Sequence, residues 1–191
     1  MPLEATFRNL TDCLHNVNDV MKSLHVTMEE PEHGEAAVVD DLRDITLELT
    51  GKVHGAQRAA ETALRSLGEP ANMDHARRSL VGCQERFHRI EQSFASDVTS
   101  YKTISELARV SGRSKQWAAW ANSATQAIDD CRQPLDQASE ALAACWQELA
   151  ERLGMTNISM QATNVGQQIT LSRDKDRDKD RDQDLEVEGV T

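Results

Sequence analysis

The chain has 191 residues, of which 39% are apolar and 28% charged, which suits one folded domain with an appendage. Its net charge of -11 disfavours binding to nucleic-acid phosphates and to anionic membrane surfaces, because like charges repel. No run approaches the roughly 20 apolar residues of a membrane-spanning helix, and the N-terminal MPLEATFRNL lacks the pattern of a secretory signal. We therefore expect a cytoplasmic protein, built mainly from helices because aromatic residues are scarce.

The first predicted helix carries apolar residues that alternate at spacings of four and three. This spacing places them on one helix face and is typical of a heptad repeat. A turn is expected next, at Pro31 and Gly34. The stripe consists of Leu3, Phe7, Leu10, Leu14, Val17, Met21, Leu24 and Met28.

The second predicted helix covers residues 35–67 and ends before Gly68 and Pro70, which stop helices. Gly51 and Gly55 lie within it and each costs about 1 kcal/mol relative to Ala. They either weaken the helix or allow a neighbour to approach closely. The apolar stripe is Val38, Leu42, Ile45, Leu49, Val53, Ala56, Ala60, Ala63 and Leu67.

The third predicted helix covers residues 72–111 and has large apolar residues at intervals of seven. Asp97 interrupts this stripe, with Val98 beside it. The stripe is Met73, Ala76, Leu80, Cys83, Phe87, Ile90, Phe94, Tyr101, Ile104 and Ala108.

The fourth predicted helix covers residues 114–153, with Ser114 as its cap. Pro134 lacks a backbone donor and predicts a kink near residues 130–133. The stripe is Trp117, Ala121, Ala124, Ile128, Cys131, Leu135, Ala138, Leu142, Cys145 and Leu149.

Four such stripes joined by short turns predict an all-α fold. We expect an antiparallel, up-down four-helix bundle over residues 1–154, with long third and fourth helices. Their distal ends are expected to project as a two-helix extension and to expose Trp117 and Trp120 unless something covers them. Because tryptophan is enriched in binding hot spots, Trp117, Trp120 and Trp146 are the candidate partner-binding residues.

Charge is unevenly distributed along the predicted bundle. Residues 1–50 carry three basic and eleven acidic side chains, whereas residues 51–89 carry seven basic and four acidic ones. These oppositely charged regions either face each other within the bundle or mark a docking surface.

The chain changes character after Gly154. Residues 155–171 form an Asn/Gln-rich polar segment with period-two apolar positions, and residues 172–191 form a mixed-charge acidic tail expected to be disordered. A helical domain followed by such a segment resembles, in layout, the effectors of amyloid-templated signalling in fungi and bacteria. That resemblance implies a self-assembly segment; the alternative is a polar linker. The candidate self-assembly residues are Asn157, Ile158, Met160, Gln161, Val165, Gln167, Gln168 and Ile169.

Nothing in the sequence supports catalysis, a cofactor or a metal site. Glu85 and His88 form one Glu-x-x-His pair, but Phe87 and Ile90 define the core face, so the pair is expected to point outward. The four cysteines have no close spacing and are expected to be buried, reduced side chains.

His54 gives a further alternative, because histidine-phosphotransfer domains are also four-helix bundles with a helical histidine. Their motif places Lys and Gly three and four residues after the histidine, where this chain has Gln57 and Arg58. The favoured hypothesis is a non-enzymatic interaction or scaffold protein. It would bind a protein partner or a second copy of itself through a helix face.

Overall fold

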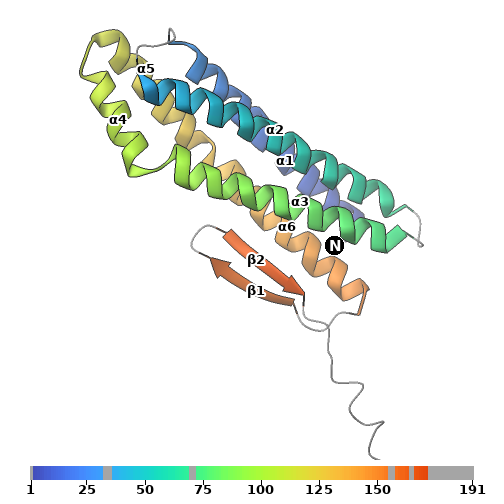
Figure 1. The fold of residues 1–191 in the computed structure, drawn as a ribbon. Coiled ribbons are helices and arrows are strands. Elements are labelled where there is room, and N and C mark those ends of the chain that lie inside the picture. Colours follow the sequence, from blue (N-terminus) through green and yellow to red (C-terminus); the bar gives the residue numbers. More distant parts are fainter. Residues whose placement is uncertain (1, 32–35, 69–71, 155–157, 164–165, 172–191) are drawn as a thin grey trace, which may run out of the picture.

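The computed structural model describes residues 2–31, 36–68, 72–154, 158–163 and 166–171. The described part is helical except for one β-hairpin near its C-terminal end (Figure 1). No described helix is both long enough and apolar enough to cross a membrane. The helical elements are α1 (Leu3–Glu29), α2 (Ala37–Ser66), α3 (Met73–Ser93), the π-helix η2 (Phe94–Val98), α4 (Tyr101–Ser111), α5 (Lys115–Asp130) and α6 (Arg132–Arg152).

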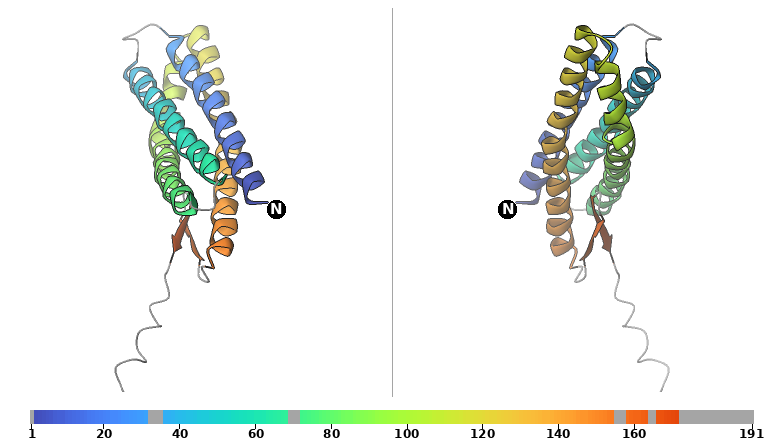
Figure 2. Two further views of the ribbon diagram at one scale, coloured as in Figure 1. Left: turned by 90° about the vertical axis from the view of Figure 1, so that its right-hand side faces the viewer. Right: turned by 90° about the vertical axis from the view of Figure 1, so that its left-hand side faces the viewer.

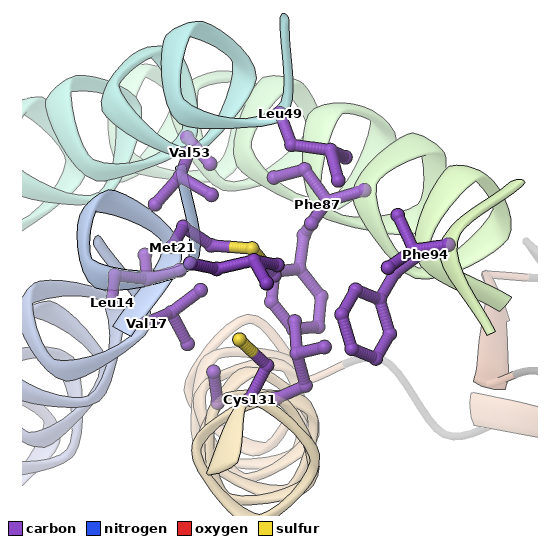
Figure 3. Packing of buried hydrophobic residues seen from close by; sticks show 14 of the residues in the cluster. Leu14, Val17, Met21, Leu49, Val53, Phe87, Phe94 and Cys131 are labelled. Carbon is purple, nitrogen blue, oxygen red and sulfur yellow. The ribbon is translucent and has the colours of Figure 1, made fainter. Parts of the chain in front are cut away.

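Helix α1 packs against other helices on two sides. It contacts α2 on one side and both α5 and α6 on the other, while α3 packs against α2 (Figures 1 and 2). All eight residues of its predicted stripe are buried, with exposed fractions of 5% or less. Figure 3 shows Leu14, Val17 and Met21 of this stripe meeting Phe87 and Cys131 in the core.

The C-terminal end of α1 is held by side chains from other helices. Arg43 of α2 is buried, and its guanidinium donates to the carbonyl oxygens of Met28, at 2.9 Å, and Pro31. Trp120 of α5 donates its indole N–H to the carbonyl oxygen of Thr27 at 2.9 Å. These donors pair carbonyl groups that a helix end leaves unsatisfied.

The predicted third and fourth helices are both interrupted. The third is divided into α3, η2 and α4, and the fourth bends at Cys131, between α5 and α6. The second break lies within the range predicted from Pro134, so that kink is confirmed. The first contradicts the expected continuous helix over residues 72–111.

The hairpin consists of β1 (Ile158–Thr163) and β2 (Gly166–Leu171), which pair antiparallel. Met160 pairs with Ile169, and Gln161 pairs with Gln168. The hairpin adds β-structure to the all-α fold that the stripes predicted. The acidic tail, residues 172–191, lies outside the described residues, so its predicted disorder stays a prediction.

Candidate functional site

The departure from helical regularity at η2 defines the most distinctive site in the structure. The backbone N–H of Thr99 donates to the carbonyl oxygen of Phe94 at 3.0 Å, a bond that spans five residues instead of four. The helix ends after this π-helical turn, because Ser100 has an extended backbone with ψ of 148°, and α4 begins as a separate helix at Tyr101. Such turns are frequent at functional sites.

The break between η2 and α4 overturns the predicted stripe beyond Phe94. Val98, Leu107 and Val110 are buried, whereas Tyr101 is 89% exposed and Ile104 is 37% exposed. Ala108 is exposed as well. The apolar positions that continue the heptad thus lie on the outside of α4, because α4 starts as a separate helix after the extended Ser100.

Polar contacts hold α4 in its new direction. The side chain of Ser100 accepts a hydrogen bond from the backbone N–H of Thr103 at 3.3 Å and so caps α4. The hydroxyl of Thr103 donates to the carbonyl oxygen of Asp97 at 2.9 Å. The change of direction is therefore stabilised at both ends of the short linker between η2 and α4.

A groove of about 470 Å³ lies between the first half of α2 and the segment from η2 to α4. It exists because α4 packs chiefly against α5 and diverges from α2 (Figure 1). The α2 wall presents Val38, Leu42 and Ile45, which occupy positions i, i+4 and i+7 of one helix face. Val38 and Ile45 are only half-buried, so this wall keeps apolar surface accessible.

Charged side chains of both signs border the same groove. Asp41 lies on the α2 wall and Lys102 on the α4 wall, and both are exposed. Glu106 and Arg109 form an ion pair of 2.6 Å on the α4 wall. An apolar strip with charged borders can bind an amphipathic segment, because apolar contacts supply area and charges fix orientation.

The structure places the three candidate tryptophans differently from the expected exposed cluster. Trp120 is 7% exposed and Trp146 is 2% exposed. Only Trp117 is half-buried, and it packs edge to face on Trp120 with ring centroids 5.3 Å apart. The end of α1 covers Trp120, so of the three residues Trp117 alone offers accessible surface to a partner.

The candidate self-assembly residues lie mostly on the hairpin. Asn157 and Val165 fall outside the described residues, and the remaining six belong to β1 or β2. The two strands pair from Ile158 opposite Leu171 to Thr163 opposite Gly166.

The thiols are unsuited to nucleophilic chemistry. Burial raises the pKa of Cys83 and of Cys131 to about 12 each, and it also raises the pKa of Cys145. These three side chains are buried and free, as predicted, whereas Cys13 is half-buried. At neutral pH such thiols stay protonated, and a protonated thiol is a poor nucleophile.

The remaining chemical candidates do not form a constellation. Glu85 is exposed, and His88 lies within 2.8 Å of the Gln92 side-chain amide on the same helix. His54 is exposed on α2, and its phosphotransfer role stays a prediction. Within the described residues there is no group of three or more His, Cys, Asp or Glu side chains that could hold a metal ion.

One carboxyl group between α3 and α6 has an unusual environment. Burial raises the pKa of Glu91 to about 7; Ser139 opposes the shift through a side-chain hydrogen bond, and Asp136 adds to it by repulsion. Ser139 and Asp136 both belong to α6. Glu91 thus links α3 to α6 directly before the π-helical turn.

Sequence reasoning missed the groove, although one signal of it was present. Asp97 occupies a heptad position where an apolar residue is expected, and Val98 beside it is the buried residue. Leu107 and Val110 are buried as well, and they do not fall on the heptad positions that Tyr101 and Ile104 occupy. A change of frame after Asp97 would have predicted that Tyr101 is exposed, but not that α4 diverges from α2.

Comparisons with protein-family models, with curated proteins and with solved structures found no match for this chain. The functional proposals therefore depend on the geometry described above.

Proposed function

We propose that this chain is a non-enzymatic interaction or scaffold protein whose framework is an antiparallel four-helix bundle. Its partner is an amphipathic helix that docks in the groove between α2 and the η2–α4 segment. The observation that carries the proposal is the divergence of α4, which leaves Val38 and Ile45 half-buried beside exposed charges. Trp117, at the same end of the molecule in α5, is the tryptophan available to extend this contact.

A helix is the preferred occupant because of how the groove is walled. Both long walls are helices, and the accessible apolar residues repeat at helical spacing along α2. Helix-in-groove recognition uses anchors at i, i+3, i+4 and i+7, which match such a wall. Asp41 and Lys102 on opposite walls favour a ligand helix with a basic edge and an acidic edge.

The test selects amphipathic helical peptides from a displayed library against the full chain and then measures their affinity for variants. Ile45→Lys places a charge on the apolar wall and should weaken binding by at least about tenfold, since charge in an apolar contact is costly. Val26→Lys is the matched control, because Val26 is 59% exposed on α1, away from the groove. Peptides that bind Ile45→Lys as tightly as the unmodified chain would show that the groove is not the docking site.

The hairpin supports a second candidate function, a signalling effector whose residues 157–171 nucleate β-assembly, with the helical domain as output. An isolated two-stranded hairpin is marginally stable in water, and within the described residues the sheet has only two strands, so both outer edges are unpaired. Residues 158–171 also carry no charge. Unpaired edges and low charge favour pairing with further copies.

A peptide of residues 157–171 should therefore form ordered fibrils that bind amyloid dyes, and the full chain should be recruited to fibril seeds. Ile169→Lys should abolish both effects, because the introduced charges repel one another in a stack of identical strands. Arg152→Lys, outside the segment, serves as the control for recruitment of the full chain. A peptide that stays monomeric and unstructured at high concentration would remove this candidate.

A further inference from the structure

The outer face of α2 has an ordered distribution of charge that the groove does not use. Its exposed residues at roughly heptad spacing run from acidic to basic, with an uncharged centre. The acidic half includes Asp44 and Glu48, and the basic half includes Arg58 and Arg65. This face lies opposite the buried stripe of α2, and Asp44, Gly51 and Arg58 on it are exposed.

The centre of this face permits close approach by another helix. Gly51 is exposed, and a Cβ atom added there would meet nothing within 4 Å. Leu47, one turn earlier, is 59% exposed and is the large apolar residue of α2 with an exposed side chain. Gly51 leaves a depression in the helix surface, and Leu47 beside it is an apolar side chain that can enter such a depression on another helix.

We infer that the outer face of α2 binds a second copy of this chain, with the two α2 helices antiparallel about a two-fold axis near Gly51. Asp44 lies seven residues before Gly51, and Arg58 lies seven residues after it. In an antiparallel pair centred on Gly51, Asp44 of each copy faces Arg58 of the other. The symmetry therefore forms two such ion pairs at once.

The exposed Leu47 also agrees with this arrangement. Leu47 of one copy falls opposite Gly55 of the other, where the Arg86 side chain crosses from α3 at 3.3 Å from the position of an added Cβ. The methylene stem of Arg86 gives Leu47 an apolar surface, because long basic side chains cover apolar groups with their stems. Burial of Leu47 thus accompanies the ion pairs.

A second copy accounts for the charges better than a different protein does. In the described part of the chain neither Asp44 nor Arg58 takes part in an ion pair, whereas Glu48 is paired with Lys52 at 2.7 Å. An acidic half and a basic half on one face are complementary to the same face turned by 180°. A parallel pair would instead align like charges along its whole length.

This interface is separate from the groove and does not depend on the proposed function. The groove lies on the side of α2 that carries Val38, Leu42 and Ile45, whereas Asp44, Gly51 and Arg58 face outward. One molecule can therefore bind a partner helix in its groove and a second copy through α2. A scaffold with both surfaces would bring two partner helices together.

The test is sedimentation analysis of the full chain and of charge-reversed variants over a wide range of concentration. The unmodified chain should form dimers that dissociate in high salt, because salt screens exposed ion pairs. Asp44→Lys and Arg58→Glu should each weaken the dimer by about tenfold, since each change removes two attractive pairs and creates two repulsive ones. The double variant Asp44→Lys/Arg58→Glu should dimerise like the unmodified chain, because complementarity is restored.

Mixing the two single variants gives the sharpest result. In the mixed dimer the lysine introduced at position 44 of one variant faces the glutamate introduced at position 58 of the other. The native Arg58 of the first variant likewise faces the native Asp44 of the second, so the mixture should dimerise more tightly than either variant does alone. Asp19→Lys on α1 and Arg152→Glu on α6, both exposed, are matched controls that should leave the dimer intact. A monomeric unmodified chain, single variants that dimerise normally, or a mixture that stays monomeric would each overturn the inference.

Discussion

Helix α1 and the segment from α3 to α4 obey the same sequence pattern but fold differently. In α1 every heptad apolar residue is buried, from Leu3 to Met28. In the second region the pattern holds as far as Phe94 and then fails, since Tyr101 is 89% exposed. A heptad stripe thus predicts the buried face of a helix only where the helix is continuous. The groove lies where the helix is interrupted and the prediction fails.

The largest expected effect is a difference in stability between substitutions at equivalent heptad positions of the two regions. Leu14→Ala should lower the free energy of unfolding by about 2–5 kcal/mol, because Leu14 is fully buried and its truncation leaves a cavity. Tyr101→Ala, in contrast, should change it by less than about 0.5 kcal/mol, because the side chain is exposed. Urea unfolding followed by circular dichroism measures both. A large loss of stability in Tyr101→Ala would mean that the stripe continues into the core.

The second effect concerns the carboxyl group just before the break. The pKa of Glu91 is raised from its ordinary value near 4.5 to about 7, so between these two pH values the folded state holds a proton that the unfolded state has lost. The free energy of unfolding should therefore increase as pH falls from about 7 to about 4.5, by on the order of 1 kcal/mol after allowance for partial exposure.

Glu91→Gln should remove this dependence and stabilise the protein at pH 8, since a neutral amide has no charge to desolvate. The matched control is Glu85→Gln, an exposed carboxyl on the same helix. Unfolding measured across the pH range compares the two variants. An unchanged slope in Glu91→Gln would assign the dependence to other groups.

A third effect should be confined to α4. Ser100→Ala removes the side-chain acceptor that caps this helix and should cost about 1 kcal/mol. Because the change is local, amide hydrogen exchange should accelerate in residues 101–111 and stay constant in α1. Ser114→Ala removes the equivalent cap of α5 and tests whether the two helices open independently. Faster exchange throughout the molecule after Ser100→Ala would show that α4 does not open separately.

The sequence was sufficient to predict those parts of the fold that depend on one helix at a time. The α1 stripe, the stripe from Ala121 to Leu149 and the kink before Pro134 follow from spacing and from proline chemistry, and the structure confirms them. The cover over Trp120 could not be predicted, because it depends on how far α1 extends beside α5. The groove could not be predicted either, because the separation of α4 from α2 is a tertiary property that residue spacing does not encode.

The smallest expected effect concerns α2, which is as continuous as α1 but has a glycine at the centre of its outer face. Gly51→Ala should raise the free energy of unfolding by about 0.5–1 kcal/mol, because Ala favours the helix and its Cβ meets open space. The same change should weaken the proposed dimer, because the added methyl groups lie where the two helices approach most closely.

Asn122→Ala, at an exposed site on α5, is the control that improves helix propensity without touching that face. For Gly51→Ala alone, the unfolding temperature of the dilute monomer should therefore rise, while the fraction of dimer measured by sedimentation of concentrated protein should fall. If both measurements show an increase, Gly51 is simply a weak point of α2, and the two-fold axis cannot pass beside it.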